Sequence, residues 1–356
     1  MMSRAWLEVD LGALARNAAA LGGRAGVQLI PMIKADAYGL GAEQVAHALE
    51  PLAPMAYGIA TIEEGSELRA AGITRPLIVF TPLLPEEMEP ANLERLTPTL
   101  GSVEEITAWA MYGSPYHLSI DTGMARAGIP WREVRSLSPV IRAQPPMGAF
   151  THFHSPQIDD DSMVEQERRF RDAVAQLPVR PAILHTDSSA AIVRHGRSPW
   201  DAVRPGIFMY GVGSGEGAGL APECVVHLKA RIVETRWLEA GDTVSYDATW
   251  TAPSSSLIAT LPLGYADGYP RGASNRGRAV VRGRVVPIRG RVTMDMMMID
   301  VTDTGAEAGD VVTLMGDAAA TSAPVDLGAI AALADMSPYE LLTGLRSRLH
   351  RTYRGQ

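Results

Sequence analysis

The stretch IPMIKADAYGLG, residues 30–41, places a single lysine between an apolar run and a turn rich in small residues. Residues 27–33 have the length and β-branched content of a buried parallel strand, which predicts that Lys34 lies at its carboxyl end. An α/β barrel keeps its chemistry at this end. A lysine with apolar walls around it loses its proton more easily and can attack a carbonyl cofactor. In isolation Lys34 is more simply an exposed lysine at a strand end, so the rest of the chain is needed to choose.

Seven further apolar, β-rich runs follow at intervals of roughly 20–35 residues. Most gaps between these runs contain a helix-like segment. Before the first strand, a helix is predicted that begins after the N-cap Asp10 and ends at Gly22 and Gly23. Alternating strands and helices in this number predict a (β/α)8 TIM-type barrel. The eight predicted strands are residues 27–33, 55–61, 76–82, 97–102, 116–123, 147–153, 182–188 and 203–211, and the helix-like segments include 62–71, 104–112, 162–176 and 188–195.

The pattern changes after Tyr210, where the glycine-rich link GVGSGEGAGLAPE has no periodicity. Beyond it, β-like runs follow one another with glycine and aspartate turns and without helices, which predicts an all-β domain. A helix-like stretch, residues 326–334, and a short basic tail close the chain. We therefore predict a barrel over residues 1–215 and a C-terminal β-domain over residues 216–356.

Composition and charge exclude several classes of protein. With 356 residues, 46% of them hydrophobic and 20% charged, the chain is typical of a globular enzyme and is not mainly disordered. A net charge of −8 without a long basic block argues against a nucleic-acid partner. No apolar run approaches the roughly 18 residues of a membrane span, the amino terminus does not resemble a signal peptide, and Cys224 has no second cysteine to pair with. A cytoplasmic location is expected, with no membrane association.

Polar side chains follow the predicted strands in an order that packing does not explain. Lys34 and Tyr38 come after the first strand, and further polar groups come after the fifth to eighth strands. A barrel brings all of these to one rim. A phosphate group binds hydroxyls and free backbone N–H groups, which Ser189 and the amides of Gly206 and Ile207 could supply. The histidines and acidic residues show no metal-ligand spacing, so no metal is predicted. The later rim residues are Arg126, His152, Ser189, Arg204 and Gly206.

Nine short motifs give these residues a common context. With its change of domain, the chain resembles the alanine racemases, pyridoxal-phosphate enzymes built from a barrel and a C-terminal β-domain. The resemblance covers essentially the whole chain. The motifs, in order, are KADAYG (34–39), IDTGMARAG (120–128), THF (151–153), SAA (189–191), VRPGI (203–207), VSY (244–246), GYADG (264–268), GRVTMD (290–295) and PYE (338–340).

The resemblance implies a role for each matching residue. Lys34 is expected to form the Schiff base with pyridoxal 5′-phosphate and to be one of two catalytic bases, the other being Tyr246 of the partner subunit in a homodimer. Arg204 would face the pyridine nitrogen, and His152 would border the second base. Phosphate contacts are expected from Tyr38, Ser189, Gly206, Ile207 and Tyr339. Arg126 is expected to contact the phenolic oxygen of the cofactor and the substrate. Further substrate contacts are expected, from the partner subunit, from Tyr265, Met294 and the segment that contains Asp295.

Elementary chemistry agrees with these roles. Racemisation removes the α-proton from one face of a carbon and returns a proton to the other, so it requires two bases on opposite sides. Tyrosine is a poor base at neutral pH because its ordinary pKa is about 10, so the hydrogen-bonding network around it has to draw off its proton. An arginine opposite the ring nitrogen would keep that nitrogen unprotonated, which favours simple proton transfer over transamination or decarboxylation.

One position departs from the family pattern. Many relatives carry a carbamylated lysine that braces the arginine of the IDTGM stretch, whereas this chain has Ser119. Serine cannot be carbamylated in that way, so Arg126 would need support from an anion, a water molecule or another side chain, and activity is expected to be insensitive to bicarbonate.

The expected function is interconversion of L-alanine and D-alanine, with D-alanine supplied to peptidoglycan synthesis. The alternatives are a racemase of broader specificity, a decarboxylase with the same cofactor, and a non-catalytic pyridoxal-phosphate carrier. Arg204 argues against a decarboxylase. The β-domain that contains Tyr246 and Tyr265 argues against a carrier, for which a lone barrel is expected.

Overall fold

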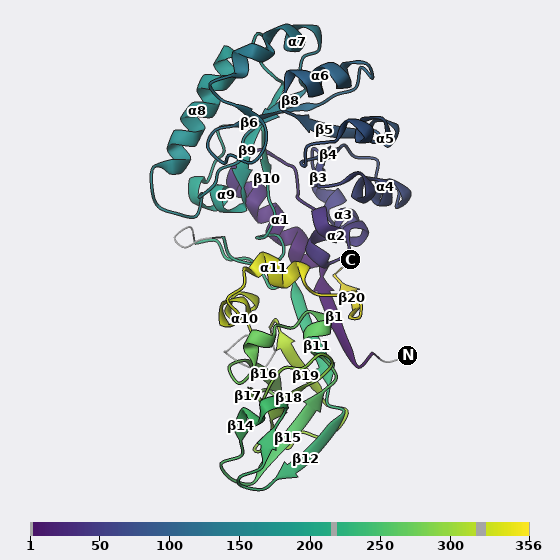
Figure 1. Ribbon diagram of the computed structural model, residues 1–356, viewed down its shortest axis with the longest axis vertical. Helices are drawn as coiled ribbons and strands as arrows, with labels where there is room; N and C mark the ends of the chain where they lie inside the picture. The colour runs from purple at the N-terminus through teal and green to yellow at the C-terminus, as the bar shows by residue number, and fades with distance from the viewer. Residues whose placement is uncertain (1–2, 215–218, 318–324, 356) are drawn as a thin grey trace.

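The chain folds into a barrel and a β-rich lobe, shown at the top and the bottom of Figure 1. The structure is a computed structural model that describes residues 3–214, 219–317 and 325–355. The predicted boundary between residues 215 and 216 lies outside these ranges. None of the helices in the described ranges is long and apolar enough to cross a membrane.

Eight parallel strands form the barrel, in the order β2-β10-β9-β8-β6-β5-β4-β3. A parallel bridge between Met32 and Gly58 joins the chain just beyond β2 to β3, which closes the ring. Each strand overlaps one predicted run, so the predicted fold class is confirmed. The strands are β2 (Gln28–Leu29), β3 (Tyr57–Ile59), β4 (Leu77–Val79), β5 (Leu96–Leu100), β6 (His117–Asp121), β8 (Gly148–Phe150), β9 (Ile183–Ser188) and β10 (Ala202–Arg204).

Helices cover the outside of the barrel, and the four predicted between strands are present. The helix after Asp10 is longer than predicted, because it continues through Gly22 and Gly23 and ends at Gly26 with φ 68°. Leu21 and Ala25 are buried on this helix, and packing of that apolar face outweighs the roughly 1 kcal/mol that a glycine costs inside a helix. The helices are α1 (Leu11–Ala25), α3 (Ala42–Leu49), α4 (Ile62–Ala70), α5 (Met88–Leu93), α6 (Val103–Ala110), α7 (Ser138–Ala143), α8 (Ser162–Gln176) and α9 (Ser189–His195).

The second lobe is a nine-stranded sheet in the order β12-β15-β18-β17-β16-β19-β11-β1-β20. Its strand β1 (Ala5–Asp10) comes from the start of the chain and lies between β11 and β20, antiparallel to the first and parallel to the second. Most of the predicted basic tail therefore belongs to a strand of this sheet. The remaining strands are β11 (Val226–Arg231), β12 (Glu234–Leu238), β15 (Ser256–Leu261), β16 (Arg278–Val281), β17 (Arg284–Arg289), β18 (Met297–Asp300), β19 (Val311–Met315) and β20 (His350–Arg354).

Two short helices join the lobes. Helix α10 (Leu327–Leu333) begins after Asp326, as the sequence predicts, and the Asp326 side chain accepts a hydrogen bond from the amide of Ala329. Helix α11 (Pro338–Thr343), which the sequence analysis did not predict, follows Ser337 and contains the PYE motif. In Figure 1, α11 lies between the sheet and the barrel, beside the segment that follows β2. The barrel rim is therefore partly built by the end of the chain.

Candidate active site

A cavity of about 740 Å³ opens where the barrel strands end. Nine of the predicted site residues line it, together with Ser119. They come from the carboxyl ends of the first, fifth, sixth, seventh and eighth barrel strands or the segments that follow them, and from α11. A single chain therefore brings these nine to one place. They are Lys34, Tyr38, Arg126, His152, Ser189, Arg204, Gly206, Ile207 and Tyr339.

Lys34 begins a turn with an uncommon backbone conformation. The residues from Ala35 to Tyr38 all have positive φ, between 52° and 57°, so the segment α2 (Lys34–Gly39) is a left-handed turn. This conformation costs roughly 1–2 kcal/mol for each residue other than glycine. The amide of Ala42 donates to the Asp36 carboxylate at 2.7 Å, which helps to hold the turn. A turn was predicted here, but not its left-handed conformation, since KADAYG has no glycine before its last position.

The ammonium form of Lys34 is disfavoured in this cavity. Burial and then the positive charge of Arg126 lower the pKa of Lys34. A smaller population of the charged form means that more of the free amine is available as a nucleophile or base. The prediction from the apolar strand before Lys34 rests on the same physical cause.

Arg204 is buried at the barrel rim, where its guanidinium forms hydrogen bonds to residues of the neighbouring strand segments. One terminal nitrogen donates to His185 Nδ1 at 2.7 Å and to the His185 carbonyl at 2.8 Å. The other donates to the carbonyls of Thr151 and Thr186 and lies 3.3 Å from His152 Nδ1. Burial lowers the pKa of Arg204 to about 10, so the side chain stays charged at neutral pH. Within the described ranges its Nε–H group has no hydrogen-bond partner, which leaves it available to a ligand.

The contact with Arg204 fixes the protons of a pair of buried histidines. An arginine can only donate, so His185 Nδ1 must accept and His185 Nε2 must carry the hydrogen. His185 Nε2 then donates to His117 Nδ1 at 2.8 Å. His185 is not among the predicted site residues, although a histidine within the strand run AILHTDS was a usable signal. Burial, followed by the charge of Arg204, lowers the pKa of His117 to about 3 and that of His185 well below its ordinary value.

His152 is also neutral in this environment. Burial and then the charge of Arg204 lower its pKa to about 3. Because an NH2 group of Arg204 faces His152 Nδ1 at 3.3 Å and cannot accept a hydrogen bond, the hydrogen of His152 is on Nε2. A neutral imidazole with this tautomer can donate one hydrogen bond from Nε2 to an oxygen brought next to it.

The predicted phosphate residues lie close together. Ser189 Oγ accepts hydrogen bonds from the amides of Gly206 at 2.8 Å and Phe208 at 3.4 Å. A Cβ atom on Gly206 would lie 2.8 Å from Tyr38 Oη, so only glycine fits without displacement. The rings of Tyr38 and Tyr339 lie 6.1 Å apart, and burial raises the pKa of both hydroxyls, which therefore keep their protons and can donate.

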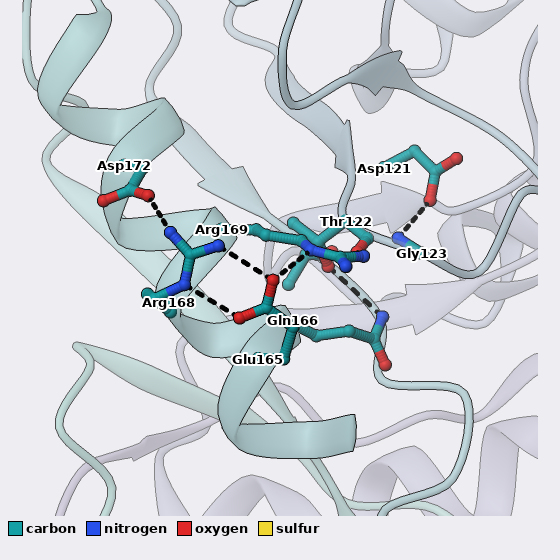
Figure 2. A network of polar contacts seen from close by, with 9 residues as sticks. Asp121, Thr122, Gly123, Glu165, Gln166, Arg168, Arg169 and Asp172 are labelled. Atoms are coloured by element: carbon teal, nitrogen blue, oxygen red, sulfur yellow. Dashed lines mark hydrogen bonds and ion pairs between the residues drawn. The ribbon is translucent and has the colours of Figure 1, made fainter. Parts of the chain in front are cut away.

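Side chains hold the backbone of residues 121–123, as Figure 2 shows, and Arg126 follows three residues later in the chain. Asp121 accepts the amide of Gly123 at 2.9 Å, and Arg169 on α8 donates to the Thr122 carbonyl at 2.8 Å. Gln166, also on α8 and buried, donates to Thr122 Oγ1 and to the His152 carbonyl, both at 3.2 Å. Helix α8 thus links the loop of Arg126 to the segment of His152.

In the described ranges, the guanidinium of Arg126 forms no hydrogen bond with another side chain. No hydrogen bond or ion pair joins it to another residue in the ranges that the structure describes. Ser119 is buried and packs against Gly128, where an added Cβ would lie 2.5 Å from Ser119 Oγ. No side chain in the described ranges therefore provides the support for Arg126 that the family resemblance leads us to expect.

The four remaining predicted residues lie outside the cavity, on the second lobe. Tyr246 follows β13 (Thr243–Val244) and is 71% exposed, and Tyr265 and Met294 are also exposed. Asp295 accepts a hydrogen bond from Arg348 at 2.8 Å. One chain does not bring these residues to Lys34, so their predicted contribution requires a second copy.

Two family models match the chain. The model of the alanine racemase N-terminal domain matches residues 9–214, and that of the C-terminal domain matches residues 225–353. An alanine racemase of Halothermothrix orenii is 37% identical, with 99% of this chain and 97% of that protein covered. One of Geobacter sulfurreducens is 36% identical, with 97% and 96% covered.

Solved structures give the same result. The alanine racemase of E. faecalis has a TM-score of 0.92 at 27% identity and covers 99% of this chain and 98% of its own. That of Bartonella henselae, which contains covalently bound pyridoxal phosphate, has a TM-score of 0.89 at 27% identity, with 99% and 100% covered. A histidine racemase from Leuconostoc mesenteroides has a TM-score of 0.90 at 24% identity over 99% of this chain and 98% of its own, which shows a shared fold alone. The chain therefore belongs to the alanine racemase family.

Proposed function

We propose that this protein is an alanine racemase, which interconverts L-alanine and D-alanine with pyridoxal 5′-phosphate. The observation that carries the proposal is the single cavity in which Lys34, Arg204 and Ser189 meet at the end of the barrel strands. Family membership over the whole chain supports the same function. When bound, the cofactor supplies an electron-withdrawing ring that makes the α-proton of the amino acid easier to remove.

The residues present fit the cofactor. Lys34 has a lowered pKa, which suits a lysine that forms an imine with an aldehyde. The free Nε–H of Arg204 suits the ring nitrogen, and the Arg204 charge opposes protonation of that nitrogen. Hydroxyls of Tyr38 and Tyr339, the hydroxyl of Ser189, and backbone amides near Gly206 suit a phosphate. No metal is needed for this set of contacts.

We assign the two bases to Lys34 and to Tyr246 of the partner subunit. Tyr246 is exposed in one chain, and so are Tyr265 and Met294 on the same lobe. Such a group of exposed aromatic and sulfur side chains is the kind of surface that a subunit interface covers. In a homodimer the neutral His152 would donate from Nε2 to the Tyr246 oxygen, which stabilises the deprotonated phenol that acts as a base.

The substrate is proposed to be small. Arg126 and the second-lobe residues Tyr265, Met294 and Asp295 would surround the carboxylate and the side chain of the amino acid. Bulky tyrosines at the mouth favour the methyl group of alanine, although rejecting one extra methylene yields only about 10–200-fold discrimination. A racemase of broader range is the second candidate, and the histidine racemase shows that this fold also serves a larger side chain.

The test is loss of the circular dichroism of L-alanine after the cofactor-saturated protein is added, repeated with a panel of L-amino acids. Decay for alanine and not for larger substrates is the expected result. No decay for any amino acid would defeat the proposal, and equal rates across the panel would favour the broader racemase. We further propose that the protein acts in the cytoplasm and supplies D-alanine for peptidoglycan, which D-alanine auxotrophy after gene deletion would test.

A further inference from the structure

The left-handed turn after Lys34 is attached to the neighbouring barrel unit by one carboxylate. Glu64, on helix α4, accepts the amide hydrogen of Ala35 on Oε1 at 2.7 Å. Its other oxygen, Oε2, accepts the amide hydrogen of Ala60 at 2.7 Å, just after β3. The Ala35 amide belongs to the residue that follows Lys34, so this contact lies next to the lysine in the chain.

We propose that Glu64 is a positioning residue for Lys34. Its carboxylate ties the turn at Ala35 to the end of β3 at Ala60, and so holds Lys34 at the cavity. Both hydrogen bonds are short and one partner is a carboxylate, which makes them stronger than neutral pairs. Four successive residues with positive φ do not adopt this conformation by themselves, so the turn needs such anchors. The inference rests on the proposed catalytic role of Lys34.

The simpler explanation is that Glu64 only caps its own helix. Thr61 is the N-cap of α4, and a glutamate three residues later commonly bonds back to the start of a helix. Helix α6 provides the comparison, because Glu105 has the same position after the N-cap Ser102. Glu105 Oε2 accepts the amides of Gly101 and Ser102, at 2.6 Å and 3.1 Å. Both bonds of Glu105 stay within its own helix start, whereas Glu64 uses its second oxygen to reach Ala35.

This pair allows a matched experiment with E64Q and E105Q. A glutamine keeps the shape of the side chain, but its NH2 group cannot accept a hydrogen bond, so only one of its two terminal atoms is an acceptor. Glu64 uses both oxygens, so E64Q loses the acceptor of either Ala35 or Ala60 and breaks the link between the turn and the end of β3. Glu105 accepts both of its bonds on Oε2, so E105Q can keep both bonds while it loses the same negative charge at a helix start. Only E64Q is therefore expected to disturb Lys34.

The measurements are amide hydrogen exchange of the peptide spanning residues 33–41 and the separate values of kcat and KM for alanine, all on holoenzyme. E64Q is expected to exchange at least about tenfold faster in this peptide. Its kcat should fall about 10–100-fold with little change in KM, since small misplacements of a reacting group have effects of this size. E105Q should match the wild type in both measurements. Equal behaviour of the two variants would overturn the inference.

Two controls keep the outcome interpretable. E64D shortens the side chain while keeping its charge, so it cannot span Ala35 and Ala60, and it replaces E64Q if that variant does not fold. If the wild type itself does not racemise alanine, the proposed function fails, while the exchange comparison still shows whether Glu64 anchors the turn. If the wild type is active and E64Q is as active as E105Q, the function stands and the positioning role of Glu64 is wrong.

Discussion

Three histidines near Arg204, of which His117 and His185 are buried and His152 is half-buried, predict a specific loss of stability in acid. The pKa values of His117 and His152 are lowered from 6.5 to about 3, and that of His185 is also lowered. Between pH 6.5 and about 3 the unfolded chain therefore binds protons that the folded chain does not. Each such histidine stabilises the fold fully above pH 6.5, and this contribution falls by about 1.4 kcal/mol per pH unit on acidification.

His117 and His152 together give a slope that approaches about 3 kcal/mol per pH unit below pH 6.5, which amounts to about 3 kcal/mol between pH 6.5 and 5, and His185 acts in the same direction. This loss is a substantial part of the roughly 5–15 kcal/mol of a typical fold. H117N is the informative change, because the asparagine oxygen can still accept from His185 Nε2 and the residue no longer titrates. Its slope should be smaller than that of the wild type by about 1.4 kcal/mol per pH unit.

The assay is urea unfolding followed by far-ultraviolet circular dichroism at several pH values between 6.5 and 5, with equal cofactor loading. H350N, which removes an exposed histidine, is the control. It should keep the wild-type slope. If the free energy of unfolding of H117N ran parallel to that of the wild type across this range, the reasoning about neutral buried histidines would be wrong.

Three further predictions concern the site. Mixing inactive K34A and Y246F chains should restore activity up to about a quarter of the wild-type level through mixed dimers, and failure despite proven subunit exchange would place each site within one chain. Activity should not respond to added bicarbonate, since Ser119 cannot be carbamylated, and a bicarbonate-dependent rate would refute this. R169M should lower kcat/KM about tenfold because Arg169 holds the Thr122 carbonyl. R168M, which also removes ion pairs on α8 and a contact with the Trp131 ring but no bond to Thr122, should not, and equal losses in the two variants would contradict this prediction.

The barrel could be predicted because each of its strands and helices is marked by residues that are close together in the sequence. Each strand is a short apolar run, and several helices begin at a side chain that caps them, such as Asp10 and Asp326. Pairings between the chain ends have no local signal. Strand β1 pairs with β20, more than 300 residues away, and only the assembled sheet shows this. The end of the chain could therefore be read only as a basic tail.

The residues of the site could largely be predicted from the sequence, whereas their backbone conformation and hydrogen bonds could not. The order of polar residues after the strands, with the family motifs, selected nine residues that share the cavity. The left-handed turn of Ala35 to Tyr38 had no signal, because tertiary contacts impose a conformation that these residue types disfavour. The contact between Arg204 and His185 joins two strands, and its hydrogen-bond directions follow only from the distances. The roles of Tyr246, Tyr265, Met294 and Asp295 stay predictions.

The central claim is that Lys34 and Tyr246 are two bases on opposite faces of the substrate. The most direct measurement is racemisation of L-alanine in ²H₂O, with the deuterium content at the α-carbon of both enantiomers determined at low conversion. Two bases predict that nearly all D-alanine formed carries solvent deuterium while the remaining L-alanine is largely protiated. D-alanine that retains the original α-proton would contradict the account, because a single base would have returned the proton it removed.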